Sequence, residues 1–285
     1  ILHFLFLIIC AMIRKVILMT ILIGWLGVDS HSPCSAYLMS DSRFTWGGTP
    51  PGYNYGQKLF ALNNSPDIFG YCGDVLFASQ TISQIVALDN SHLLFPKNSD
   101  CSMKSKIVFE QIERQFTSYP ARHASSIYHI SRNFDTTFHV YRYSCNGLSA
   151  KWNLEELTFP NTTSSLIFAD GSGASEFQSL YREYQNGDIA GTSRNIYQCF
   201  CNSLMHSKIP TCGGSPQLVG LYRGKKFNGL SFGIIYQKKR HFLGSPSPTM
   251  PDYNVVRWYN ENFEICDGNS MERFPGAMRQ PNPNH

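Results

Sequence analysis

Hydrophobic residues along this chain occur in short runs, and the period of those runs changes in a definite order. The runs TILIGWLGV (20–28) and SAYLMSDSR (35–43) are separated by the turn-rich DSHSPC, which predicts a hairpin of two buried strands. Two more short apolar runs follow, QKLFAL (57–62) and DIFGYCG (67–73). The opening part of the chain therefore predicts strands of a sheet.

After residue 74 the hydrophobic period becomes that of a helix. The apolar residues of the segment 75–88 fall on one helical face, namely Val75, Ala78, Ile82, Ile85 and Val86. Asp74 stands at the N-cap position, where a carboxylate accepts hydrogen bonds from the first turn. A second helix is predicted near 104–116, where Val108, Ile112 and Phe116 recur at a spacing of four. We expect these helices to pack on the first sheet.

The second half of the chain repeats this order. Strands are predicted at TTFHVYRYSC (136–145) and SSLIFADG (164–171), then a helix after Gly173 and another that carries Ile196, Phe200 and Leu204 and ends before Pro210. The last predicted strands are PQLVGLYR (216–223) and LSFGIIYQ (230–237). Strands, two helices, strands, two helices and strands predict an α+β protein, a four-layer αββα sandwich with two central sheets between helix layers.

Composition is that of a folded protein with a substantial core, because 42% of the 285 residues are hydrophobic and 15% are charged. The formal net charge of +4 is small, and its basic clusters, GKKFNG and QKKRH near Lys225 and Lys238, are interpreted as solvated lysines that flank a hairpin. No nucleic-acid-binding motif accompanies them. We expect neither a nucleic acid nor a membrane as partner.

The nine cysteines are an odd number at irregular spacing in a chain too large to need disulfides for stability. They indicate reduced, mostly buried thiols in a cytoplasmic protein. Cys199, Cys201 and Cys212 could suggest zinc, but no second CxxC and no clustered histidines complete a ligand set. We expect no metal and no cofactor.

The first residues pose a separate question. The run ILHFLFLIICAMI has the apolarity of a signal-peptide core or part of a membrane span, but the basic pair Arg14 and Lys15 follows it and each half is shorter than the ~20 residues of a spanning helix. We expect residues 1–18 to be upstream translation or a dispensable extension, and Met19 to be the physiological start. Removal of Met19 would leave Thr20 as the N-terminal residue of the mature protein.

An ordered set of short motifs from Thr20 to about Lys239 resembles proteasome β-type subunits, members of the N-terminal nucleophile (Ntn) hydrolases, and is more similar to the simpler bacterial relatives. Thr20 matches the nucleophile at the start of the first strand, and SDSR matches an Asp-x-Arg motif at Asp41 and Arg43. Lys58 in GQKLF matches the lysine beneath the nucleophile.

Three later motifs extend the resemblance. The segment GYCGD matches the turn before the first long helix, which implies that the Gly70 amide contributes to the oxyanion hole. The sequence Gly171-Ser172-Gly173 places a serine that would hydrogen-bond the nucleophile's amine, and Cys212 in CGG stands where the family usually has serine. Ile209 replaces the aspartate that is usual three residues earlier.

The resemblance implies a mechanism in which the α-amine of Thr20 is the general base. An α-amine with a pKa of roughly 7.7–8 is largely able to accept the hydroxyl proton at cellular pH, so Thr20 must be the first residue. Lys58, held charged by Asp41, would lower the proton affinity of the nearby amine and hydroxyl. Because Ile209 replaces the usual aspartate, the resemblance implies slower catalysis, altered proton handling or no peptidase activity.

The sequence thus predicts an upstream segment (1–19), an Ntn-hydrolase domain (20–240) and a C-terminal extension (241–285) that packs on the core or on a neighbouring subunit. The leading hypothesis is a threonine-type peptidase acting on peptides or proteins and assembled as a homo-oligomeric ring or stack, with no unfoldase partner identified. One alternative is an amidohydrolase acting on a small amide, since fold does not fix substrate. The other is an inactive, membrane-anchored or assembly-only subunit.

Overall fold

The computed structural model describes residues 20–46, 49–120, 123–147, 151–224 and 228–277, and over these ranges it confirms the predicted α+β class. Helices and strands are combined in two large sheets, antiparallel except for the parallel pair β12–β15, a two-stranded ribbon and two pairs of helices. The helices are α2 (Val75–Asn90), α3 (Cys101–Thr117), α4 (Ala174–Tyr184) and α5 (Ser193–His206).

The larger sheet has nine strands in the order β10-β1-β2-β11-β12-β13-β14, with β15 paired to β12 and β16 paired to β15. Its first hairpin is the one predicted from sequence, and the register Leu22↔Ser40 sets the start of β1 beside the end of β2. The strands are β1 (Leu22–Val28), β2 (Pro33–Ser40), β10 (Ser165–Asp170), β11 (Gln217–Tyr222), β12 (Leu230–Tyr236), β13 (Lys239–Phe242), β14 (Ser245–Pro246), β15 (Trp258–Tyr259) and β16 (Ile265–Cys266).

The smaller sheet has five strands in sequential order, β5 (Leu59–Ala61), β6 (Asp67–Gly73), β7 (Ser125–Arg132), β8 (Phe138–Cys145) and β9 (Asn153–Leu157). The sequence did not predict β7, although all eight of its residues are buried. Its sequence, SSIYHISR, mixes serine, histidine and arginine with apolar residues. Because both faces of this strand are covered, its polar residues make internal hydrogen bonds and no hydrophobic alternation marks the strand.

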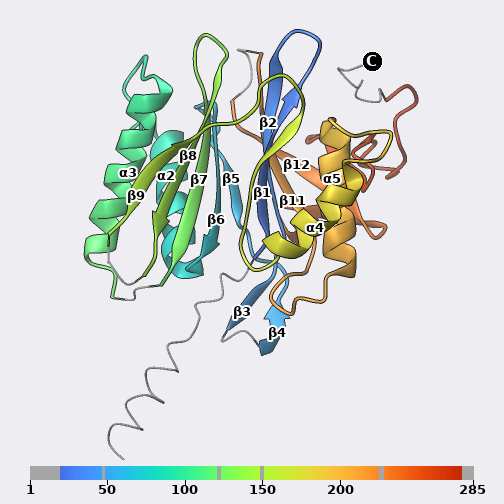
Figure 1. Ribbon diagram of the computed structural model, residues 1–285, viewed down its shortest axis with the longest axis horizontal. Helices are drawn as coiled ribbons and strands as arrows, with labels where there is room; N and C mark the ends of the chain where they lie inside the picture. The colour runs from blue at the N-terminus through green and yellow to red at the C-terminus, as the bar shows by residue number, and fades with distance from the viewer. Residues whose placement is uncertain (1–19, 47–48, 121–122, 148–150, 225–227, 278–285) are drawn as a thin grey trace, which may run out of the picture.

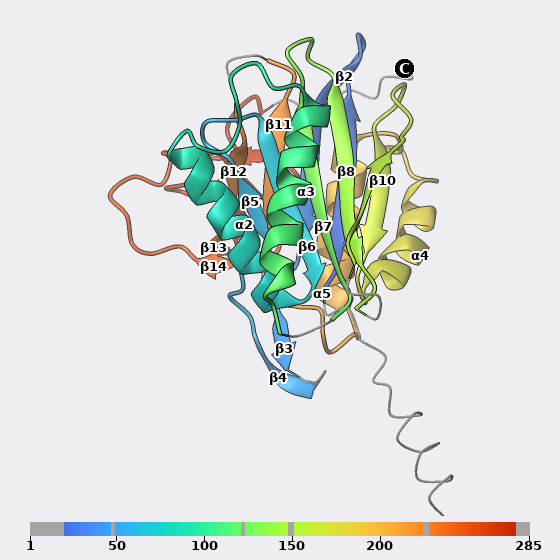
Figure 2. The same cartoon turned by 90° about the vertical axis from the view of Figure 1, so that its left-hand side faces the viewer.

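The two sheets lie face to face, and a pair of helices covers the outer face of each (Figure 1). Helices α2 and α3 cover the five-stranded sheet, as the view from that side shows (Figure 2). Helices α4 and α5 cover the nine-stranded sheet. A third apolar cluster, which includes Leu22, Leu38, Leu59 and Ile130, fills the space between the sheets.

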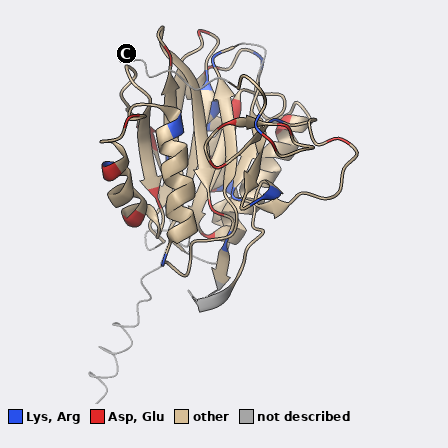
Figure 3. Cartoon of the chain, turned by 90° about the vertical axis from the view of Figure 1, so that its right-hand side faces the viewer, with Lys and Arg blue, Asp and Glu red and all other residues tan. Residues whose placement is uncertain are grey.

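The helix starts follow the capping pattern expected from the sequence. Asp74 caps α2 by accepting a hydrogen bond from Phe77 N, and Thr192 caps α5 by accepting one from Asn195 N. Helix α3 begins three residues earlier than predicted, at Cys101, because Asp100 accepts from Met103 N. On the side covered by α4 and α5, lysines and arginines are scattered among the elements (Figure 3).

Two further segments complete the fold, a two-stranded ribbon and the C-terminal segment. A ribbon of β3 (Phe44–Trp46) and β4 (Thr49–Tyr53) projects from the end of the molecule at which β2 finishes (Figure 1). The C-terminal segment runs back over the nine-stranded sheet, where Phe263 stacks between Tyr197 and Tyr259 with centroid distances of 4.6 Å. Residues 1–19 lie outside the described residues. Among the helices that are described, none has the length and apolarity to cross a membrane.

Candidate active site

Three side chains that the sequence places far apart meet at one end of the two sheets. Thr20 precedes β1, Asp41 follows β2, and Lys58 precedes β5 of the other sheet. The β1–β2 register brings Asp41 beside the start of the chain's first strand, where Asp41 N donates to Ile21 O at 3.3 Å. Because the two sheets pack face to face, Lys58 just before β5 also lies beside Thr20 and Asp41.

The three polar groups are in direct contact. Thr20 Oγ1 donates to Asp41 Oδ1 at 2.7 Å, and Lys58 Nζ donates to the same oxygen at 2.6 Å. Lys58 Nζ also donates a hydrogen bond to Thr20 Oγ1. Thr20 and Lys58 are 1% exposed and Asp41 is 0% exposed, so this is a buried charge pair with a hydroxyl held against it.

Backbone amides fix the orientation of the Asp41 carboxylate. Oδ1 accepts from Ile21 N at 3.1 Å, while Oδ2 accepts from Arg43 N at 3.1 Å and from Gly213 N at 3.0 Å. Buried carboxylates are tolerated when such donors replace water. Both oxygens are therefore held, and the oxygen that faces Thr20 and Lys58 cannot rotate away without losing several hydrogen bonds.

Gln217 is a site residue that the sequence did not indicate. Its Oε1 accepts from Lys58 N at 3.0 Å, and its Nε2 donates to the carbonyls of Asp41 at 3.0 Å and Gly56 at 2.8 Å. One fully buried amide thus ties the backbones on both sides of the charge pair together. In the sequence, Gln217 could have been noticed only as a single polar residue at the start of the apolar strand PQLVGLYR.

The Gly171-Ser172-Gly173 turn lies against the backbone of Thr20. Gly173 N donates to Thr20 O at 3.1 Å, and Ser172 Oγ donates to the same carbonyl at 3.3 Å. Gly171 has a φ of +94°, and a Cβ there would lie 2.3 Å from Thr20 O. Only glycine allows this approach. The predicted serine is therefore brought to Thr20, in contact with its carbonyl oxygen.

The segment around residue 212 completes this side of the site. Ser172 Oγ contacts Thr211 Oγ1 at 2.7 Å and Cys212 Sγ at 3.5 Å, so Thr211 is a second residue that the sequence did not indicate. Ile209 packs against the core under α4 and α5. Burial, followed by the nearby charge of Asp41, raises the pKa of the Cys212 thiol to about 11.

Arg43 connects this segment to the projecting ribbon. Its Nε donates to Asn54 Oδ1 at 2.8 Å, and its Nη1 donates to the carbonyls of Pro210 at 3.1 Å and Cys212 at 3.2 Å. A Cβ at Gly213 would lie 2.4 Å from Arg43 Cζ, so the guanidinium packs directly on that backbone. Arg43 is thus a positioning residue for the segment that holds Ser172.

The structure does not bring the Gly70 amide to Thr20. Gly70 is in the middle of β6, opposite Leu59 on one side and Tyr128 on the other. Tyr71 N donates to Lys58 O, so the alternation of an antiparallel ladder directs the Gly70 amide toward β7. The same alternation directs the amide of Gly73, the last residue of β6, toward the β5 side.

Gly73 has conformational features that the sequence alone did not reveal. Its φ is +105°, and it stands between the end of β6 and the N-cap Asp74 of α2. The signal was present in GYCGD as a second glycine next to the capping aspartate. Its amide points past Leu59, the first residue of β5, on the side that carries Lys58.

Within the described ranges, histidine, cysteine, aspartate and glutamate side chains form no group of three or more that could hold a metal ion. The cysteines of these ranges are all free thiols, and only Cys34 is partly exposed. At Thr20 the structure brings together its hydroxyl, the Asp41–Lys58 pair and the surrounding backbone amides.

Comparisons with known proteins show a shared fold. No family model matches the chain, and no curated protein matches it. Among solved structures, the chain is similar to a mutant of Anbu from Hyphomicrobium sp. strain MC1, with a TM-score of 0.51 and 11% identity over 79% of this chain and 87% of that chain. At this identity the likeness concerns the fold alone.

Proposed function

We propose that this protein is a proteasome-like Ntn hydrolase with a four-layer αββα sandwich, in which Thr20 is the nucleophile of a threonine-type peptidase. The observation that carries the proposal is the contact of Thr20 Oγ1 with Asp41 and Lys58 in a buried cluster assembled from both sheets. The fold shared with Anbu, a bacterial proteasome-like protein, supports it.

The proposed reaction uses the mature N-terminus. The α-amine of Thr20 accepts the hydroxyl proton as Oγ1 attacks the carbonyl carbon of the substrate amide. The amine then gives this proton to the leaving nitrogen, the C–N bond breaks, and an ester links the acyl group to Oγ1. Water, deprotonated by the same amine, hydrolyses the ester and returns Thr20 to its starting state.

The charge pair has an electrostatic role in this scheme. The ammonium of Lys58 lies against Oγ1, so its field stabilises the alkoxide character that develops during attack. Asp41 pairs with this lysine in a site closed to solvent and accepts a hydrogen bond from the Thr20 hydroxyl. Ser172 and Gly173 hold the Thr20 carbonyl, which fixes the direction in which the amine and the hydroxyl point.

The oxyanion donor is assigned to Gly73 in this proposal. A donor must be an amide that no neighbouring strand uses, and Gly73 lies where β6 runs beyond the first residue of β5. One such donor contributes about 2.7–4 kcal/mol to transition-state stabilisation. The Gly70 amide, turned toward β7, is not available for this role.

The test compares three proteins that differ only at the N-terminus: a chain beginning at Thr20, a chain that retains Met19, and a chain beginning at Ala in place of Thr20. Each is assayed with fluorogenic peptide amides and with a peptide epoxyketone, a reagent whose adduct needs both the hydroxyl and the free amine. We expect turnover and a mass adduct at Thr20 in the first protein only. Equal turnover in the chain that retains Met19, or in the Thr20→Ala chain, would exclude the mechanism.

A further inference from the structure

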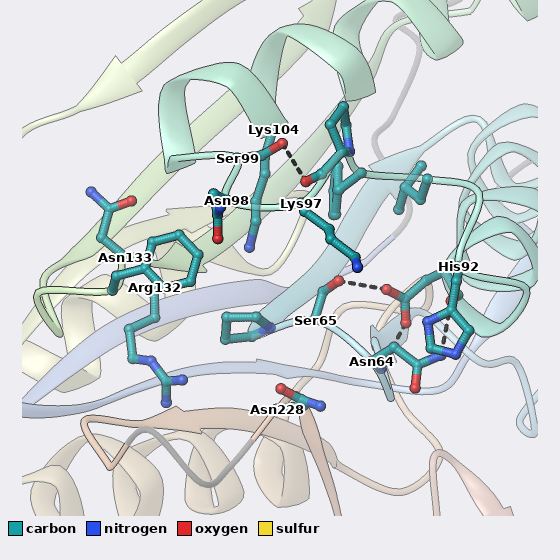
Figure 4. Close-up of a pocket in the computed structure, with 16 residues that line it drawn as sticks. Asn64, Ser65, His92, Lys97, Asn98, Ser99, Lys104, Arg132, Asn133 and Asn228 are labelled. Atoms are coloured by element: carbon teal, nitrogen blue, oxygen red, sulfur yellow. Dashed lines mark hydrogen bonds between the residues drawn. The ribbon is translucent and has the colours of Figure 1, made fainter.

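A polar cavity lies at the end of the sheets opposite Thr20. It has a volume of about 620 Å³ and lies among the β5–β6 turn, the α2–α3 loop, the end of β7 with its following turn, and the segment before β12 (Figure 4). Volumes of 300–1,000 Å³ are typical of small-molecule sites. The cavity is therefore large enough for a small organic ligand.

The length of strand β6 gives the distance between the cavity and the candidate active site. Asp67, the first residue of β6, lies behind the cavity, where it contacts the lining residue Lys104. Gly73, the last residue, lies at the Thr20 end. Seven residues in extended conformation span about 20 Å. The cavity and the Thr20 cluster are thus separate sites, and the cavity contains none of the residues proposed for hydrolysis.

Three cationic side chains from three elements line the cavity. Lys97 comes from the α2–α3 loop, Lys104 from the first turn of α3 and Arg132 from the end of β7. The amines of Lys97 and Lys104 point into the hollow (Figure 4). Lys104 and Arg132 are each only 6% exposed, so the fold holds two cations out of bulk water at this point.

Acidic groups offset only part of this charge. Asp67 accepts from Lys104 Nζ at 2.6 Å and from His129 Nε2 at 2.8 Å. Asp89 is the carboxylate that lines the cavity among the described residues, and it accepts from Ser65 Oγ at 2.6 Å and Asn64 N at 2.9 Å. Lys104 is thus paired with Asp67, and the Arg132 guanidinium donates to the carbonyls of Tyr222 and Gly224. The lining itself contains three cationic side chains and the one carboxylate of Asp89 among the described residues, which leaves an excess of positive charge.

An apolar wall stands beside the cations. Leu94, Phe95 and Phe134 line the cavity, and Lys104 Nζ lies 5.3 Å from the centroid of the Phe95 ring. Phe134 is 63% exposed at the rim of the cavity. The two residues before it are held by hydrogen bonds, Arg132 to the Gly224 carbonyl and Asn133 to the Cys101 amide. A ligand that fits both parts of the cavity carries an anionic group and an apolar group.

We propose that this cavity binds a small organic phosphate monoester, with its phosphate facing Lys97, Lys104 and Arg132 and its apolar part against Phe95 and Phe134. A phosphate carries about −1.5 to −2 charges near pH 7 and has several acceptor oxygens, which suits several cations from different elements better than a single carboxylate does. The proposal does not depend on Thr20 being a nucleophile.

The test measures binding rather than hydrolysis. Phenyl phosphate, benzoate and inorganic phosphate are titrated by isothermal calorimetry into the full chain at constant ionic strength, so that non-specific screening is equal. We expect saturable binding of phenyl phosphate, at least ten times weaker binding of inorganic phosphate, and still weaker binding of benzoate. No saturable binding of phenyl phosphate, or equal binding of benzoate, overturns the assignment.

The variant of choice is Lys97→Gln, because Lys97 is exposed whereas Arg132 holds the Gly224 carbonyl at 2.7 Å and its loss could prevent folding. The matched control is Lys106→Gln, an exposed lysine of α3 that does not line the cavity. We expect Lys97→Gln to weaken phenyl phosphate binding at least tenfold and Lys106→Gln to leave it unchanged. Equal effects of the two variants would reduce the binding to general surface charge and refute the site.

Discussion

Lys58 Nζ lies 2.6 Å from Asp41 Oδ1 across the junction of the two sheets, with the two side chains 1% and 0% exposed. Neither sheet alone contains this ion pair, because Asp41 follows a strand of the nine-stranded sheet and Lys58 precedes a strand of the five-stranded sheet. The pair therefore forms only when the sheets face each other. Its presence beside Thr20 couples the chemistry of the site to the packing of the whole molecule.

Replacement of the lysine by methionine tests this coupling. We expect Lys58→Met to reduce kcat/KM for peptide amides more than 100-fold, because the field on Thr20 Oγ1 is lost. The unpaired Asp41 should also lower the free energy of unfolding by about 3 kcal/mol. In Asp41→Asn/Lys58→Met we expect stability to recover while activity stays lost. Denaturant melts and steady-state kinetics check this, and recovery of activity in the double variant would contradict it.

A methyl group at Gly171 should displace Thr20. The φ of +94° and the 2.3 Å approach to Thr20 O leave no room for a Cβ. We expect Gly171→Ala to destabilise the protein by roughly 1–2 kcal/mol or more, the cost of a left-handed conformation for a residue with a side chain. We expect kcat/KM for peptide amides to fall by more than the loss of folded protein can explain. Gly187→Ala is the control, because its added Cβ meets only Tyr184 O at 3.5 Å.

The thiol of Cys212 should be unreactive at neutral pH. Its pKa is raised to about 11 by burial and by the charge of Asp41, so the thiolate is a minor species at pH 7. We expect iodoacetamide to modify partly exposed Cys34 first and Cys212 only on unfolding or at strongly alkaline pH. Peptide mapping by mass spectrometry follows both sites. Rapid labelling of Cys212 at pH 7 would show that the thiolate is stabilised instead.

Serine at position 212 should be accepted. Cys212 Sγ contacts Ser172 Oγ at 3.5 Å, and a hydroxyl can make the same hydrogen bond over a shorter distance. We expect Cys212→Ser to keep kcat/KM within about threefold of the parent protein. Valine at this position removes one of the polar partners of Ser172 and leaves Thr211 and the Thr20 carbonyl in place, so the comparison of the two variants isolates the hydrogen bond to residue 212.

Acid should destabilise the fold through Asp67 and His129. Burial lowers the pKa of His129 below 6.5, so the unfolded chain binds more protons as the pH falls below that value, and stability decreases. Burial alone would raise the pKa of Asp67, but the hydrogen bond from His129 and the charge of Lys104 lower it. The contribution of Asp67 is therefore present above about pH 3.8 and is lost as the pH falls below that value.

Urea melts between pH 7 and about pH 3 measure this dependence, with His129 acting in the upper part of the range and Asp67 in the lowest part. We expect the free energy of unfolding to decrease continuously on acidification, and His129→Gln to flatten the part of the curve just below pH 6.5. Exposed His92 provides the control, since His92→Gln should leave the slope unchanged. A parent protein with constant stability from pH 7 to pH 5 would contradict the assignment of a neutral buried His129.

The proposed ring or stack makes a prediction about size. Light scattering coupled to size-exclusion chromatography should give a mass several times that of one subunit, which is 32.3 kDa for the full 285-residue chain and smaller for a chain beginning at Thr20. The number of subunits should be the same in the Thr20→Ala variant. A strictly monomeric but active enzyme would instead favour the small-amide alternative, because restricted access through assembly would then be absent.

The sequence by itself determined the elements whose patterns are local. The start of α2 at Val75 could be predicted because a capping side chain and an apolar stripe lie within one segment, and the first hairpin because two apolar runs flank a polar turn. Strand β7 escaped prediction because its serines and His129 satisfy their hydrogen bonds inside the protein, and no periodicity records that. The candidate site residues came from resemblance of motifs, not from pattern.

Only the tertiary structure decided which of those residues meet. Thr20, Asp41, Lys58 and Ser172 are joined by packing of the two sheets and by the turn after β10, which are contacts between residues far apart in sequence. The structure places Gln217 in the site and directs the Gly70 amide away from it. Both follow from strand register and neighbouring strands, which set the direction of each polar group. A linear sequence lists donors and acceptors, but the fold alone orients them.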